Sequence, residues 1–279
     1  MRIALITPLR DERESIDSLF EAIASQTVPI AYWLIIENNS SDGSDEYLRQ
    51  KEKPGNVKEL VVLNLNMDGG YQLGFKYSSI IKHGMEYISE QFPGFDYIGI
   101  LDADCIPEPG YYETLLNHFS ENKETGILSG KLYEANRAYF TPDFPKGNCR
   151  LWRRECFLDA GYQTGMSADS ISATMARLKG WKTKAIDTTS VTTRKVSIRV
   201  SKVYSGKANY YKGIRLNYVA VKFLLYLVRL KPVDAVQYLY GYLSSMATRA
   251  EKIDNPQIRE FYEGYFGYKF RNFKKRIAP

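Results

Sequence analysis

The stretch YIGILDAD at residues 97–104 joins an apolar run to two carboxylates that are separated by one alanine. The run Tyr97–Leu101 is uncharged throughout, which is typical of a short strand buried in a parallel sheet. Asp102 and Asp104 follow at once, so both carboxylates stand where the chain leaves the sheet. Hard divalent cations bind such oxygen ligands and usually complete their shell with substrate phosphates. The stretch therefore predicts a buried strand with a metal site at its carboxyl end.

Strand-like and helix-like patterns alternate on both sides of this stretch, up to about residue 195. Such alternation predicts an α/β fold, a mainly parallel sheet covered by helices on both faces. After residue 195 the pattern changes to helices, with a break at Pro232. We therefore expect a domain at residues 1–195 and a helical extension at residues 196–279. The expected strands are Arg2–Leu9, Tyr32–Ile36, Val57–Leu63 and Tyr97–Leu101, and the expected helices are 16–23, 73–88, 109–119, Tyr218–Leu230 and Val233–Ala250.

The loops after the four predicted strands share a polar character. Ligands of open α/β sheets bind beyond the carboxyl ends of the strands, so these loops are the first candidates for a site. Each loop carries acidic or amide side chains, which predicts one polar ligand site at this edge of the sheet. The loops are Thr7–Glu12, Glu37–Asp42, Asn66–Gly70 and Asp102–Asp104.

The composition excludes several classes of protein. With 279 residues, 44% hydrophobic and 25% charged, the chain can bury a large core, so disordered, collagen-like and disulfide-scaffold classes are excluded. Three cysteines without CxxC or Cys/His spacing argue against a disulfide framework or a structural zinc and indicate a reducing compartment. The N-terminus lacks a signal sequence, and no apolar stretch is long enough to span a membrane, so we expect a cytoplasmic protein.

Five motifs follow one another in the first 195 residues. They are the strand and turn Ile3–Pro8 with the helix end Ser25-Gln26-Thr27, the segment Ile35–Asp42, the triplet Asp102-Ala103-Asp104, the segment Asn148–Phe157, and Asp169 eleven residues before Gly180-Trp181. In this order they resemble the motifs of a family 2 glycosyltransferase with the GT-A fold. An ordered set of this kind is far more specific than any one member.

The resemblance implies transfer of a sugar, with inversion, from a nucleoside-diphosphate donor to a hydroxyl group of a glycan or lipid-linked acceptor. UDP is favoured over GDP. Asp104, with Asp102, would hold Mn²⁺ or Mg²⁺ against the diphosphate. Asp169 would accept the proton of the attacking hydroxyl, although it could also cap the helix that follows it.

The resemblance also implies two groups of binding residues. A nucleotide pocket would be formed by Thr7, Pro8, Arg10, Glu12, Glu37, Asn39, Asp68, Asp102 and Ala103. Contacts to phosphate or acceptor would come from Lys76, Trp152, Arg153, Arg154 and Arg194. For Arg153 and Arg154 a role as plain surface charges stays open, as it does for Lys76.

Three positions depart from the family pattern. Glu37 replaces the usual aspartate, Ala168 replaces the glutamate of an acidic pair, and Thr193 replaces a histidine before the arginine matched by Arg194. A non-catalytic nucleotide-sugar-binding protein therefore stays open as an alternative. A nucleotidyltransferase is a second alternative, although Thr7–Glu12 lacks the glycine-rich phosphate loop expected of one. No GxGxxG follows a strand, which argues against NAD.

The charge is divided unevenly along the chain. Residues 194–279 hold 18 Lys and Arg against 5 Asp and Glu, a net of +13, and residues 1–193 hold 20 against 27, a net of −7. The apolar Tyr218–Leu230 and the cationic Lys269–Arg276 predict attachment to an anionic membrane surface, on its cytoplasmic face. Alternatively, these helices pack on the first domain or on the second subunit of a homodimer. Without an RRM, KH or helix-turn-helix pattern, nucleic acid is not expected as a partner.

Overall fold

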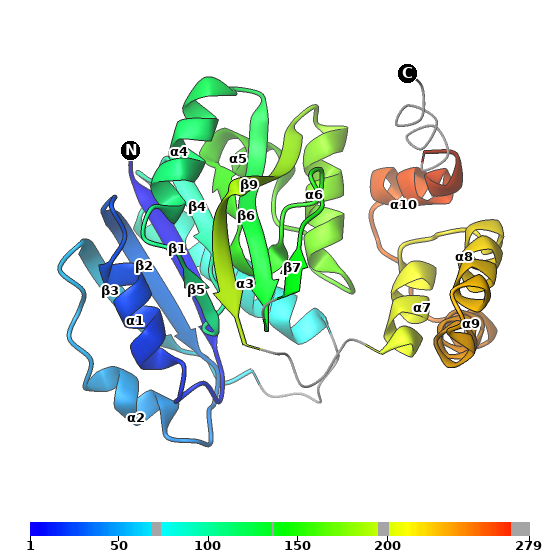
Figure 1. Ribbon diagram of the computed structural model, residues 1–279, viewed down its shortest axis with the longest axis horizontal. Coiled ribbons are helices and arrows are strands. Elements are labelled where there is room, and N and C mark those ends of the chain that lie inside the picture. The colour runs from blue at the N-terminus through cyan, green and yellow to red at the C-terminus, as the bar shows by residue number, and fades with distance from the viewer. Residues whose placement is uncertain (68–73, 136, 195–200, 269–279) are drawn as a thin grey trace. The chain divides into compact units, whose positions relative to one another are not determined.

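The computed structural model describes residues 1–67, 74–135, 137–194 and 201–268 (Figure 1). The chain divides into two compact units, Met1–Lys195 and Val196–Pro279. The first unit contains an α/β fold, and the described part of the second is helical. Asp68 and the segment Lys269–Arg276, both singled out above, lie outside the described residues.

Nine strands form one sheet in the described part of the first unit. They are β1 (Ile3–Leu9), β2 (Ile30–Glu37), β3 (Val57–Asn64), β4 (Tyr97–Ile100), β5 (Cys105–Pro107), β6 (Thr125–Glu134), β7 (Arg137–Tyr139), β8 (Leu151–Arg153) and β9 (Lys182–Thr193). Their order is β3-β2-β1-β4-β8-β6-β9-β5, with β7 paired to β6. Strands β3, β2, β1 and β4 are parallel neighbours, as β6 and β9 are. Strand β8 is antiparallel to both β4 and β6. The prediction of a mainly parallel sheet is confirmed.

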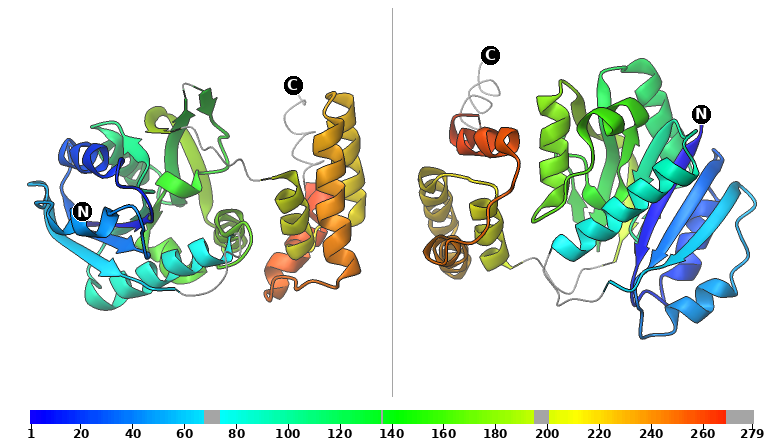
Figure 2. Two further views of the ribbon diagram at one scale, coloured as in Figure 1. Left: turned by 90° about the horizontal axis from the view of Figure 1, so that it is seen from below. Right: turned by 180° about the vertical axis from the view of Figure 1, so that it is seen from behind.

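Helices cover both faces of this sheet (Figure 2). On one face, α1 (Ile16–Ala24) and α4 (Tyr111–Glu121) pack into the main apolar cluster. The other face is covered by α3 (Phe75–Gln91), α5 (Arg154–Ala160) and α6 (Ala168–Leu178). A Cβ on Gly84 of α3 would lie 2.7 Å from Ile36 Cδ1, so glycine permits a close approach of this helix to β2. The short helix α2 (Ser44–Arg49) follows β2 and was not predicted.

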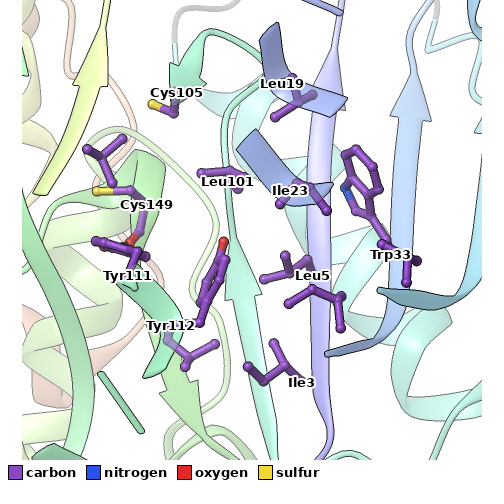
Figure 3. Packing of buried hydrophobic residues seen from close by; sticks show 14 of the residues in the cluster. Ile3, Leu5, Leu19, Ile23, Trp33, Leu101, Cys105, Tyr111, Tyr112 and Cys149 are labelled. Carbon is purple, nitrogen blue, oxygen red and sulfur yellow. Dashed lines mark hydrogen bonds between the residues drawn. The ribbon is translucent and has the colours of Figure 1, made fainter. Parts of the chain in front are cut away.

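The main apolar cluster packs against β1, an interior strand of the sheet. Figure 3 shows Ile3 and Leu5 of β1 packed between Trp33 of β2 and Tyr112 of α4. The Trp33 indole N–H donates a hydrogen bond of 3.0 Å to the hydroxyl of Thr7, which is fully buried. The buried indole thus keeps a polar partner, as buried tryptophans usually do. All three cysteines are buried free thiols, and two of them, Cys105 and Cys149, belong to this cluster.

Four helices form the described part of the second unit. They are α7 (Lys202–Tyr211), α8 (Leu216–Val228), α9 (Pro232–Ala247) and α10 (Pro256–Glu263). Helices α7 and α9 cross at Gly206 and Gly241, where an added Cβ on either glycine would overlap backbone atoms of the other helix. Beside this crossing the Asn209 amide donates a hydrogen bond of 2.6 Å to the Tyr238 hydroxyl. Within the described residues no helix combines the length and the apolar character needed to cross a bilayer.

Candidate active site

The two carboxylates after β4 lie in a turn that connects two strands of different direction. The backbone N–H of Asp102 donates to the carbonyl of Asn148 at 2.9 Å, in the 3-10 helix Gly147–Cys149 that precedes β8. The turn then enters β5, where Cys105 pairs with Thr193 at the end of β9. The turn is therefore held between two segments that are distant from it in sequence.

Like Asp104, Asp102 is partly buried. Burial raises its pKa to about 8, although the hydrogen bond from Tyr77 acts in the opposite direction. The Tyr77 hydroxyl donates to Asp102 Oδ1 at 2.6 Å. The neighbouring carboxylates Asp104 and Asp169 raise the pKa of Asp102 further. The side chains of Asp104 and Asp169 therefore both lie near Asp102, and a divalent cation beside Asp102 would favour its ionised form.

Asp104 faces the other wall of the site. Its Oδ2 accepts a hydrogen bond of 2.8 Å from the Thr193 hydroxyl and lies 3.7 Å from Arg194 Nε. Arg194 also forms an ion pair with Glu12, whose pKa is raised mainly by burial. Arg194 is half exposed, whereas Asp104 and Glu12 are largely covered. The end of β9 thus brings a hydroxyl and a guanidinium to the acidic turn, and Glu12 joins them from the loop after β1.

Asp169 lies in the first turn of α6 and is paired with a buried arginine. Arg150 Nη2 is 2.8 Å from Asp169 Oδ1, and Nη1 donates to the main-chain carbonyl of Asp169 at 3.2 Å. The Arg150 side chain is 0% exposed, while that of Asp169 is 43% exposed. Arg150 Nε donates to the carbonyl of Lys146. The interpretation of Asp169 as a helix cap is wrong, because Ser167 occupies the N-cap of α6.

Gly147 lies directly against the Asp169 carboxylate. A Cβ at this position would overlap Oδ1, Oδ2 and Cγ of Asp169. The next residue, Asn148, accepts the hydrogen bond from Asp102 described above. The segment Gly147–Cys149 therefore contacts both the turn of Asp102 and Asp104 and the side chain of Asp169.

The loops after β1 and β2 are connected by hydrogen bonds. Asp11 Oδ1 accepts from the Ser41 backbone N–H at 2.7 Å, and the Asp11 N–H donates to Ser40 Oγ at 3.0 Å. Glu37 is 3% exposed, and its carboxylate accepts from the N–H groups of Ser40 at 2.6 Å and Asn39 at 3.2 Å. Glu37 is therefore buried beneath this loop and holds its backbone by two hydrogen bonds.

The remaining pocket candidates lie along the same edge. Asn39 is exposed in a left-handed backbone conformation, and Arg10 is exposed beside Asp11. Pro8 is partly buried at the end of β1, and Ala103 is buried between the two aspartates. Lys76 is partly buried in the first turn of α3, next to Tyr77. Of the pocket candidates, Thr7 is corrected: its hydroxyl is used inside the core by Trp33.

Three further predictions are corrected by the direction of β8. Because β8 is antiparallel to β4, Arg153 pairs with Tyr97, at the opposite end of the strand from Asp102. The Arg153 guanidinium donates to the carbonyls of Phe119, Asn122 and Thr125, and that of Arg154 donates to the carbonyl of Phe95. Trp152 is fully buried against Phe157. The structure therefore places Trp152, Arg153 and Arg154 away from the turn of Asp102 and Asp104.

The sequence analysis missed Arg150, Gly147 and Tyr77. Arg150 carries a signal, since it is a charged residue between the apolar Cys149 and Leu151. Only the antiparallel pairing of β8, however, brings that end of the segment to Asp102. Tyr77 carries no signal that distinguishes it from the chain's other tyrosines.

The donor set suits a hard divalent cation that is held jointly with a substrate. Within the described ranges no group of three or more His, Cys, Asp or Glu side chains could hold a metal by itself. Asp102 and Asp104 offer carboxylate oxygens, and Mg²⁺-like ions commonly bind through one or two carboxylates plus substrate phosphates. The residues therefore fit Mn²⁺ or Mg²⁺ together with a diphosphate.

Solved structures of glycosyltransferases share this fold. TarS from S. aureus matches 87% of this chain with a TM-score of 0.58 and 13% identity, and the chain spans 43% of the length of TarS. Residues 1–349 of TarS in complex with UDP-GlcNAc match 95% of this chain, over 80% of their own length, with a TM-score of 0.58 and 14% identity. The mannosyltransferase PcManGT from Pyrobaculum calidifontis, in complex with GDP-Man and Mn²⁺, matches 94% of this chain, over 83% of its own length, with a TM-score of 0.52 and 14% identity. The fold is the GT-A fold of glycosyltransferases.

The sequence places the chain within this class. The model of glycosyl transferase family 2 matches residues 4–167, more than half of the chain. The protein therefore belongs to glycosyl transferase family 2. The match covers Asp102 and Asp104 and ends two residues before Asp169. A comparison with curated proteins gives no match.

Proposed function

We propose that this chain is a divalent-metal-dependent, inverting glycosyltransferase that uses a nucleoside-diphosphate sugar, with UDP as the nucleotide. The acceptor would be a hydroxyl group of a glycan or a lipid-linked glycan. The observation that carries the proposal is the convergence of Asp102, Asp104 and Asp169. Asp102 and Asp104 lie in one turn, and Asp169 is close enough to raise the pKa of Asp102. The segment Gly147–Cys149 contacts both that turn and Asp169.

The donor would bind across the carboxyl edge of the sheet. Among the neighbouring structures, TarS is found with UDP and with UDP-GlcNAc, and PcManGT with GDP-Man and Mn²⁺. The loops after β1 and β2 would hold the nucleoside, and Asp102 and Asp104 would face the diphosphate through the cation. When bound, Mn²⁺ or Mg²⁺ would supply Lewis-acid stabilisation of the leaving diphosphate. Arg194, half exposed beside Asp104, would add a second positive charge.

The transfer would be a single displacement. The acceptor oxygen attacks the anomeric carbon, the bond from that carbon to the β-phosphate oxygen breaks, and the nucleoside diphosphate leaves with the electron pair. The hydroxyl proton passes to the carboxylate of Asp169. Its 43% exposure leaves room for an acceptor to approach, while Arg150 holds it from the buried side.

Donor binding and transfer can be separated by two substitutions. UDP, GDP, TDP and CDP are each tested by thermal shift with Mn²⁺, Mg²⁺ or EDTA. A nucleotide at 100 times its Kd stabilises by about 2.7 kcal/mol, and we expect a metal-dependent shift with UDP. Asp104→Asn should abolish this shift. Asp169→Asn should keep the shift and lose transfer, whereas the exposed Asp187→Asn should retain both.

Other outcomes would contradict the proposal in distinct ways. Metal-dependent nucleotide binding without transfer to any of a panel of acceptors would favour a non-catalytic binding protein. Release of pyrophosphate from a nucleoside triphosphate and a sugar phosphate would favour a nucleotidyltransferase. Retention of the anomeric configuration, read from the NMR coupling constant of the first product formed, would exclude single displacement.

A further inference from the structure

Helix α8 carries an unusually large exposed apolar surface. Of its thirteen residues only Val219 is buried. Val221, Leu224, Leu225 and Val228 are 41%, 57%, 48% and 79% exposed. They recur at the helical spacing i, i+3, i+4, i+7, so they form one stripe on this helix.

Helix α9, which packs against α8, carries an exposed apolar stripe of its own. Its buried residues Ala235, Tyr238, Gly241, Tyr242 and Ser245 form the face toward α7. Val233, Val236, Tyr240 and Leu243 are 66%, 61%, 64% and 37% exposed. At 100° per residue the centres of the two sets lie about half a turn apart. The exposed stripe is therefore the face of α9 that the described residues of this unit leave uncovered. We call the two stripes together with Leu230 at the tip the α8–α9 face.

The tip of the hairpin combines strong exposure with positive charge. Leu230 is 89% exposed and lies between the exposed cations Arg229 and Lys231. In residues 216–247 three cations, Lys222, Arg229 and Lys231, stand against the single acid Asp234. Exposed apolar surface of this extent marks an interaction site in most proteins.

The charge and the side-chain types of the α8–α9 face together indicate which kind of partner it binds. A second copy of the chain would bring another region with a net charge of +13 against the first. A single-stranded nucleic acid would require stacking aromatic side chains, whereas this face is built mainly from leucine and valine. Aliphatic side chains flanked by Arg and Lys match acyl chains beneath anionic headgroups. A helix of thirteen residues is about 20 Å long, too short for a bilayer core of about 30 Å, so it would lie in the plane of the interface.

We propose that the α8–α9 face inserts into the interface of an anionic lipid membrane, with Leu230 and its flanking cations at the headgroup boundary. This attachment does not rest on the glycosyl transfer proposed above, and its test uses no sugar donor.

Vesicle flotation of the full chain tests the proposal. Vesicles of equal parts phosphatidylcholine and phosphatidylglycerol should carry the wild type to the top of the gradient at low ionic strength, and vesicles of phosphatidylcholine alone should carry much less. The double substitution Val228→Asp with Val236→Asp should lower the partition coefficient about tenfold or more, because two exposed apolar side chains are replaced by anions. Substitution of Arg229 and Lys231 by Gln should lower it by about fivefold for each cation, on anionic vesicles only.

A matched control separates this face from general surface hydrophobicity. Leu158 on α5 is 63% exposed in the first unit, and Leu158→Asp should float like the wild type. Circular dichroism should show native helix content in every variant. Unchanged flotation of the Val228→Asp, Val236→Asp protein would overturn the proposal. So would a wild-type dimer that this variant dissociates without any effect of vesicles, or binding of a single-stranded oligonucleotide that displaces the vesicles.

Discussion

At the scale of single residues, the proposed base is held by a partner that is far less exposed than itself. Arg150 is fully buried, and its guanidinium finds two carbonyl oxygens and one carboxylate oxygen. A buried charge is tolerated only where such acceptors replace water. The position of Arg150 is therefore fixed by its buried partners, and Arg150 in turn positions the carboxylate of Asp169.

We expect Arg150→Met to lower kcat by about 100-fold, because a misplaced base costs about this much. The donor Kd should change little, since Arg150 contacts Asp169 and not the turn of Asp102. Arg150→Lys should recover part of the activity by restoring the charge. Steady-state kinetics and thermal shift with nucleotide are the measurements.

Arg153→Met provides the matched control for this prediction. Arg153 also donates to main-chain carbonyls, but at the far end of β4. Its loss should lower the melting temperature and leave kcat per folded molecule unchanged. If Arg150→Met behaved in the same way, the role of Arg150 would be purely structural.

Gly147 provides an independent test of the same carboxylate. In Gly147→Ala the new methyl group would occupy the place of the Asp169 carboxylate, which must rotate away. We expect kcat to fall at least tenfold with donor binding retained, a loss of about 1.4 kcal/mol or more in transition-state stabilisation. In Gly110→Ala, where nothing lies within 4 Å of the new Cβ, kcat should be unchanged. Equal activity of both variants would show that the carboxylate needs no fixed position.

At the scale of secondary-structure elements, the direction of one short strand decides which arginine belongs to the site. The segment Asn148–Phe157 contains Arg150, Arg153 and Arg154. Because β8 is antiparallel to β4, its N-terminal side lies beside Asp102 and its C-terminal side beside Tyr97. Residues three positions apart on a strand are separated by about 10 Å. Arg150 therefore reaches the site, and Arg153 cannot.

Helices α7 and α9 cross closely because Gly206 and Gly241 each contact the backbone of the other helix. In Gly206→Ala the new methyl group would overlap the carbonyl of Tyr238 and the N–H of Tyr242, and backbone cannot yield as a side-chain end does. We expect a loss of about 3 kcal/mol in the stability of this unit, at the upper end of the cost of overpacking.

Thermal melts followed by circular dichroism measure this loss. Gly264→Ala in the same unit meets its nearest atoms at 3.7 Å and should melt as the wild type does. A Gly206→Ala protein that melted like Gly264→Ala would show that α7 and α9 can separate at little cost.

At the scale of the whole molecule, the unfolding of the two units can be followed by different spectroscopic signals. All three tryptophans, Trp33, Trp152 and Trp181, lie in the unit Met1–Lys195, whereas helical circular dichroism reports both units. We expect UDP with Mn²⁺ to raise the midpoint seen by tryptophan fluorescence by several degrees. Gly206→Ala should lower the midpoint of the helical signal and leave the fluorescence midpoint in place. A single shared transition in every case would show that the two units unfold together.

The sequence by itself determined the mainly parallel sheet and its first four strands, because buried strands and amphipathic helices are visible as local periodicity. It also pointed to Asp102 and Asp104, which follow a recognisable strand, and, through the family resemblance, to Asp169. It could not assign Thr7 and Trp152 to the core, Arg153 to the far end of β4, or Arg150 to the site. Those assignments depend on strand direction and on which distant segments meet, and tertiary packing alone decides both.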